Sequence, residues 1–216
     1  PISWHSSRDR LAQVATTLGI LQGNMGKLTE DIILLMQTEI NEVLEPPSKG
    51  KGGSSSMPHK RNPVSCIAIR ANSKRMPGLV SSMLNCLDGD HERATGHWHA
   101  EWETLSSIVM LAAGSARQAV VITNGLEVDS IRMLRNLELT KGLIYAENVN
   151  NALARHIGKL NAEELVEKAC KEAQLQQTHL KEVIKNDPEA TQCLSLEQIN
   201  RLFDPQYSVG LYEEYI

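Results

Sequence analysis

Apolar side chains recur every seven residues in two parts of the chain. Near the start, two such series interleave: Leu11, Leu18, Met25, Ile32 and Val14, Leu21, Leu28, Leu35. Paired series of this kind are typical of helices packed in a bundle, so they predict a long helix from about residue 8 to residue 43. A second pair predicts another long helix: Trp98, Leu105, Ala112, Ala119 and Trp102, Val109, Ala116, Thr123.

The segment between these two helices begins with a loop and continues as a third helix. Pro46 and Pro47 end the first helix, and the residues that follow, up to Ser56, are rich in Gly, Ser and Lys. Asn62 is placed to cap the next helix, with Pro63 at its first position. Pro77 predicts a kink or break near the middle of that helix.

Beyond Gly125 the pattern changes to shorter amphipathic segments, at about 130–139, 143–157, 162–184 and 196–203. Asp129 and Asn161 are predicted to cap two of them. No strand pattern competes with these helices. We therefore predict an all-α chain, with a long-helix bundle in residues 1–125 and a small C-terminal helical domain in residues 126–216.

Composition excludes several classes of protein. The net charge is −4, with 22 basic and 26 acidic residues spread along the chain, so there is no basic stripe for nucleic acid or an anionic membrane. The longest uncharged stretch in the apolar middle, residues 104–116, is shorter than the roughly 18 residues of a membrane span. The four cysteines form no CxxC pair, which favours reduced thiols in a soluble, cytoplasmic protein.

The two pairs of apolar series have a further consequence. Together they offer more apolar surface than three helices can cover. We therefore expect further helices, from the rest of a longer chain or from other subunits, to complete the bundle.

The loop at about 48–62 carries the candidate chemistry. Gly/Ser-rich segments are often plain linkers, but this one continues from Gly53 to Asn62 as GSSSMPHKRN, with cationic side chains and hydroxyls directly before a helix. Turn amides, the positive end of the helix and Lys60 are suited to bind a carboxylate. They are also suited to stabilise the dianion formed when the neighbouring carbon loses a proton, with a serine as the base.

The wording GSSxMPxKxN resembles the loop shared by the fumarase/aspartase superfamily, and the chain matches every fixed position of it. The resemblance implies a homotetrameric enzyme that needs no metal or cofactor and whose active sites are shared between subunits. By this resemblance Ser54 is the catalytic base, and Lys60 and Asn62 bind a substrate carboxylate. Ser55 and Met57 help to shape the loop.

Two features indicate a branch of the superfamily. Ile67 stands where many members have a glutamate that supports a catalytic histidine, and residues 91–105 read HERATGHWHAEWETL. Both resemble bacterial 3-carboxy-cis,cis-muconate cycloisomerases of protocatechuate catabolism, in the β-ketoadipate pathway. Adenylosuccinate lyases, which share MPHKRNP and HER, are the alternative. On either reading the chain resembles the C-terminal half of an enzyme, and we expect it to be inactive alone.

The side chains of residues 91–105 have several possible roles. His91 and Arg93 are placed to contact a substrate carboxylate or a neighbouring chain. Trp98 and Trp102 are expected to pack in the core at i,i+4, the alternative being a place in the substrate pocket. His97 and His99 face different sides of a helix, so we expect no metal pair there.

Overall fold

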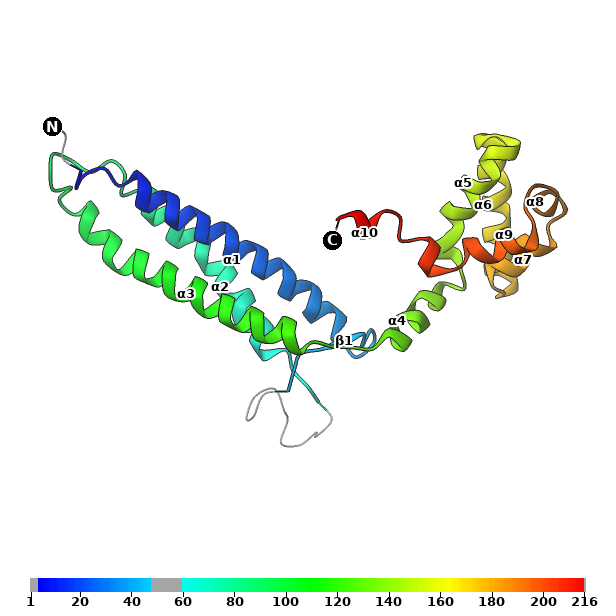
Figure 1. Cartoon of the computed structure of the whole chain (residues 1–216), viewed down its shortest axis with the longest axis horizontal. Helices are drawn as coiled ribbons and strands as arrows, with labels where there is room; N and C mark the ends of the chain where they lie inside the picture. The colour runs from blue at the N-terminus through cyan, green and yellow to red at the C-terminus, as the bar shows by residue number, and fades with distance from the viewer. Residues whose placement is uncertain (1–3, 48–59, 216) are drawn as a thin grey trace. The chain divides into compact units, whose positions relative to one another are not determined.

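A computed structural model describes residues 4–47 and 60–215 (Figure 1). The chain divides into two compact units, Pro1–Arg132 and Met133–Ile216, and each is described by itself. Helices dominate both units, so the all-α prediction is confirmed. The division predicted at residue 125 stays a prediction.

The first unit is built on three long helices, α1 (Asp9–Leu35), α2 (Val64–Leu84) and α3 (His97–Gly125), which run alongside one another (Figure 1). Their shared core is formed by side chains that are at most 2% exposed: Ala15, Met76, Met83, Ile108 and Ala112. Helices α1 and α2 approach closely, because a Cβ added at Gly26 would lie 2.6 Å from Ser73 Cβ.

The apolar series of α1 and α3 divide between two faces. In α1, Met25 and Ile32 of the first series are buried, whereas Val14 and Leu21 of the second series are 48% and 43% exposed. In α3 the first series includes the buried Ala112, and the second series exposes Trp102, Val109 and Thr123. One face of each helix therefore packs within the chain, and the other presents apolar side chains that no described residue covers.

The long helices differ from the sequence expectations at three places. Helix α1 ends at Leu35 instead of near Val43, because Val43–Leu44 (β1) pairs antiparallel with Glu127–Val128 (β2). The expectation of no strands is therefore wrong, since two-residue strands are too short to show an alternating pattern. Helix α2 continues through Pro77 without a break, and Met76 before it is 1% exposed in the core, so packing outweighs the local cost of the proline.

By length and composition, α3 would also be able to cross a membrane, the one such helix in the described part of the chain. A single helix of this kind is weak evidence, and the two-faced heptad pattern of α3 is the pattern of a bundle helix.

Helix α4 (Ser130–Leu137) spans the division between the units. The Asp129 cap is confirmed, since the Arg132 N–H donates to Asp129 Oδ1 at 2.9 Å. In its described residues, the second unit contains six further α-helices: α5 (Ala146–Ile157), α6 (Lys159–Gln176), α7 (Leu180–Asn186), α8 (Pro188–Cys193), α9 (Leu196–Leu202) and α10 (Tyr212–Tyr215). Short 3₁₀ turns precede α5 (Glu138–Thr140 and Leu143–Tyr145) and α10 (Pro205–Tyr207).

The second unit has a core of its own, in which Val149, Leu153 and Ile199 are fully buried. The helix predicted over 162–184 is two helices, because Gln177 adopts a left-handed conformation (φ 54°) and ends α6. Asn161 does not cap that helix. The N-cap is Gly158, and the Asn161 amide instead donates to the Ile157 carbonyl oxygen at 2.9 Å.

Candidate active site

Three residues of the candidate loop lie within the described chain. Lys60 is exposed, and Arg61 and Asn62 are partly buried just before α2. The other predicted loop residues, Ser54, Ser55 and Met57, lie outside the described residues. The described geometry of the site is therefore that of Glu45 before the loop, of residues 60–62 at its end, and of the start of α2.

The start of α2 is capped by a residue that the sequence did not suggest. Pro63 is the N-cap and has no side-chain donor or acceptor to offer, so the prediction that Asn62 caps the helix is wrong by one position. Instead the buried Glu45 carboxylate accepts hydrogen bonds from the amides of Ser65 (3.0 Å) and Cys66 (3.1 Å). A carboxylate at a helix N-terminus satisfies free amides and offsets the positive helix end.

This arrangement changes the expectation that the end of α2 would bind a substrate carboxylate. The amides of Ser65 and Cys66 already donate to an internal carboxylate. Burial, and secondly the contact with Glu45, raises the pKa of the Cys66 thiol to about 12. The thiol is therefore neutral at physiological pH, and Cys66 is not a nucleophile.

Arg61 also has an internal partner. Its Nη1 donates to Glu127 Oε2 at 2.7 Å and its Nη2 to Glu127 Oε1 at 3.0 Å, while Nη2 also donates to the Glu45 carbonyl oxygen. The Glu127 carboxylate raises the pKa of the Arg61 guanidinium, and the guanidinium lowers the pKa of Glu127. Arg61 is thus paired in a forked geometry, whereas Lys60 presents its ammonium group on an exposed side chain.

The structure does not bring His91 and Arg93 close to Lys60. Both are exposed in the turn between α2 and α3, with His91 in a left-handed conformation (φ 44°). This turn and the strand β1 beside the candidate loop lie at opposite ends of the bundle (Figure 1). Helix α2 lies between Lys60 and His91, and its 21 residues are roughly 30 Å long at about 1.5 Å per residue.

The segment that follows His91 is anchored to the start of α1. Arg8 Nε donates to both oxygens of Glu101, at 2.8 and 3.0 Å, and only 3% of the Glu101 side chain is exposed. Trp98 and Trp102 meet edge to face with ring centroids 5.2 Å apart, so they are in contact at i,i+4. The expected core position is wrong for Trp102, which is 56% exposed.

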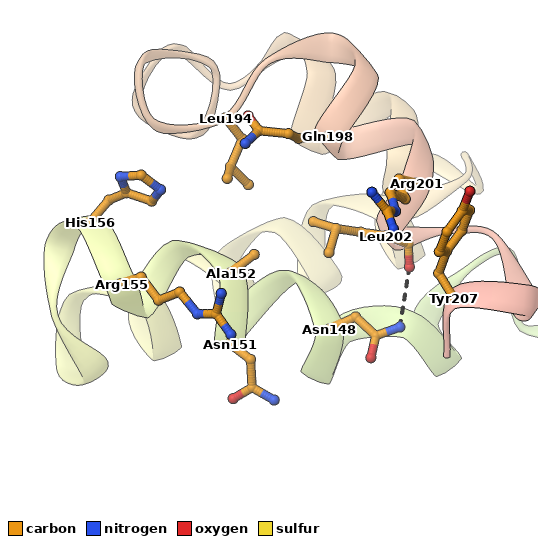
Figure 2. Close-up of a pocket in the computed structure, with 10 residues that line it drawn as sticks. All are labelled: Asn148, Asn151, Ala152, Arg155, His156, Leu194, Gln198, Arg201, Leu202 and Tyr207. Carbon is orange, nitrogen blue, oxygen red and sulfur yellow. Dashed lines mark hydrogen bonds between the residues drawn. The ribbon is translucent and has the colours of Figure 1, made fainter. Parts of the chain in front are cut away.

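A cavity of about 520 Å³ opens on the second unit, between α5 and α9 (Figure 2). Asn148 crosses one end and donates to the Leu202 carbonyl oxygen at 3.2 Å. The Arg201 guanidinium lies over the Tyr207 ring, 4.0 Å from its centroid. None of the residues predicted to bind substrate lines this cavity.

Comparisons with known proteins place the chain in a family. Residues 3–78 match the family model described as Lyase, and residues 142–216 match the one described as Adenylosuccinate lyase C-terminus. A 3-carboxy-cis,cis-muconate cycloisomerase of Pseudomonas putida is 49% identical over 197 residues, which are 91% of this chain and 47% of the relative. The chain belongs to the fumarase/aspartase superfamily.

Two further relatives agree with this placement in the superfamily. The cycloisomerase of the same name from Acinetobacter baylyi is 45% identical, over 99% of this chain and 48% of its own length. The crystal structure of the 3-carboxy-cis,cis-muconate lactonizing enzyme from Pseudomonas putida matches with a TM-score of 0.89 and 47% identity, covering 98% of this chain and 47% of that one. The chain thus spans about half the length of the superfamily relatives that it matches.

Within the superfamily pattern, Ile67 remains the departure noted above. It lies in the first turn of α2, where it is 51% exposed and offers an apolar surface in place of a carboxylate. The nearby buried carboxylate is that of Glu45, a residue that sequence reasoning missed. No local signal in the sequence identifies it, because its partners lie 20 and 21 residues further along the chain.

Proposed function

We propose that the whole protein interconverts 3-carboxy-cis,cis-muconate and 4-carboxymuconolactone, as a cycloisomerase of protocatechuate catabolism in the cytoplasm. The observation that carries this proposal is the 45–49% identity to two cycloisomerases of that name, over nearly all of the chain. The chain would supply the latter part of the central bundle and the C-terminal domain. It is expected to be inactive without the rest of the protein.

The reaction needs an anion site and a proton carrier. One substrate carboxylate adds to the conjugated double bond, and the carbon beside another carboxylate gains a proton. In the reverse direction that carbon loses its proton, charge builds up on its carboxylate, and the lactone C–O bond breaks. The ammonium of Lys60 would stabilise the resulting aci-carboxylate dianion, and Ser54 would transfer the proton. No metal or organic cofactor is needed.

The remaining candidate residues would hold the substrate. Asn62 is assigned to a second carboxylate contact, and Ser55 and Met57 to the shape of the loop. His91 and Arg93 of one copy would contact a carboxylate of the substrate bound at the loop of a neighbouring copy. Within their own chain, α2 holds them roughly 30 Å from Lys60.

An oligomer would bring these groups together. The apolar faces of α1 and α3 that remain exposed, around Leu21 and Val109, suit packing against further long helices. By the superfamily resemblance the assembly is a homotetramer. Each active site would then combine the loop of one copy with residues 91–93 of another.

One assay tests the proposed function. The full-length protein is given 3-carboxy-cis,cis-muconate and, separately, adenylosuccinate, which is the alternative suggested by the match of residues 142–216. Loss of the diene's ultraviolet absorbance is expected with the first substrate only, and Ser54→Ala is expected to abolish it. Cleavage of adenylosuccinate alone would refute the proposal, and full activity of Ser54→Ala would remove Ser54 from the mechanism.

A further inference from the structure

Three residues join the two ends of the candidate loop, and we call them the loop-base cluster: Glu45, Arg61 and Glu127. Glu45 precedes residues 46–60 in the chain, and Arg61 follows them. Arg61 Nη2 donates to the Glu45 carbonyl oxygen, which holds these two ends in contact. Glu127 lies in β2, directly opposite Leu44 of β1, so the strand pairing places its carboxylate beside the same joint.

We infer that the loop-base cluster positions Lys60 for catalysis and that Arg61 does not bind substrate. This inference rests on the proposed function. Lys60 is covalently attached to Arg61, whose guanidinium is fixed by three hydrogen bonds to Glu127 and Glu45. A guanidinium held by both Glu127 and Glu45 has little freedom, which limits where the adjoining Lys60 can lie. Placement errors of about 1 Å can cost on the order of 100-fold in rate.

The geometry of Arg61 argues against a contact with substrate. Its two terminal nitrogens form a bidentate pair with Glu127. A substrate carboxylate would have to displace that carboxylate and would compete for the same donors. Only the planar fork of arginine matches this arrangement, so a lysine at position 61 would keep the charge and lose the geometry.

Glu45 contributes the second half of the joint. It is 7% exposed, and its carboxylate bonds the amides of Ser65 and Cys66 at the start of α2, while its carbonyl oxygen bonds Arg61. Glu45 thus fixes both the first turn of α2 and Arg61, which stands three positions before the helix begins. Lys60 is therefore bonded directly to a residue whose position Glu45 and Glu127 fix.

The kinetic test uses the full-length protein and three variants. Glu127→Gln and Arg61→Lys are each expected to lower kcat/KM for 3-carboxy-cis,cis-muconate by about tenfold, with Tm within about 2 °C of wild type. Glu30→Gln is the matched control, because Glu30 forms a comparable ion pair with Arg70 between α1 and α2; it is expected to leave kcat/KM unchanged.

A role for Arg61 in binding substrate would give different results. If Arg61 bound substrate, Glu127→Gln would free its guanidinium and lower KM, and Arg61→Lys would raise KM while leaving kcat unchanged. Either result, or unchanged kcat/KM in both variants, would overturn the inference. A wild-type protein with no turnover of this substrate would instead refute the proposed function.

A second measurement tests the joint without using activity. Glu45→Gln keeps the size of the side chain but removes the charge and one acceptor oxygen. Hydrogen exchange of the Ser65 and Cys66 amides is expected to accelerate by about tenfold in this variant, while the buried middle of α2 exchanges as in wild type. Unchanged exchange of these two amides would show that Glu45 does not hold the helix start, and would refute that part of the inference.

Discussion

The pair of Arg8 and Glu101 gives a quantitative prediction about stability. Their side chains are 12% and 3% exposed, and they join the start of α1 to the first turns of α3. Replacing Glu101 by Leu leaves the Arg8 guanidinium nearly buried without its carboxylate. Breaking a buried pair from one side costs about 3–5 kcal/mol, and the small exposure of Arg8 favours the lower limit, about 3 kcal/mol.

The double variant separates pairing from packing. In Arg8→Met/Glu101→Leu neither charge remains, and such apolar replacements of a whole pair cost little. We therefore expect its free energy of unfolding to lie within about 1 kcal/mol of the wild-type value. The free energy of unfolding is measured for the full-length protein by urea titration with circular dichroism. Protein concentration is held fixed, because assembly contributes to apparent stability.

The decisive quantity is the difference in the free energy of unfolding between the single and the double variant. Glu101→Leu alone should be less stable than the double variant by about 2 kcal/mol. Lys27→Met serves as a control, because Lys27 and Asp31 form an exposed pair on α1, and it should cause no measurable change. If Glu101→Leu is as stable as the double variant, the pair is not desolvated as described and the reasoning is refuted.

The packing of α2 leads to three further predictions. The pKa of the Cys66 thiol, raised mainly by burial to about 12, predicts no alkylation by iodoacetamide at pH 8 in the folded protein; labelling of the Cys66 peptide in mass spectrometry would contradict this. Because the unfolded thiol ionises first, the contribution of Cys66 to stability is complete below about pH 9 and is lost as pH rises toward 12, which urea titrations at both ends would detect. Gly26→Ala would place a methyl group 2.6 Å from Ser73 Cβ, so it should destabilise the protein by about 1–3 kcal/mol, and an unchanged Tm would contradict the close approach of α1 and α2.

The sequence predicts the bundle well because helix burial is a local, periodic property. The seven-residue series identify α1 and α3, and the change of pattern after Gly125 identifies the shorter helices. Contacts between distant residues are not predictable in this way. The pairing of Val43 with Val128, which shortens α1, and the capping of α2 by Glu45 both depend on tertiary contacts.

At the candidate site, too, the sequence predicts local features and misses contacts between distant residues. The loop wording identifies Lys60 and places it before a helix, as the structure has it. It also suggests that the cationic side chains of the loop and the helix end add positive charge for a substrate. The structure instead pairs Arg61 with Glu127, 66 residues further on, and fills the helix end with Glu45. A count of cationic side chains cannot reveal such partners.

In the proposed function, a cycloisomerase site combines the loop of one copy with residues 91–93 of another. Full-length Lys60→Met and Arg93→Met proteins are each expected to be inactive on 3-carboxy-cis,cis-muconate. When the two are unfolded, mixed and refolded together, some sites receive both intact segments, and turnover should return. If the mixture stays inactive while wild type refolded in the same way recovers its activity, the claim is contradicted.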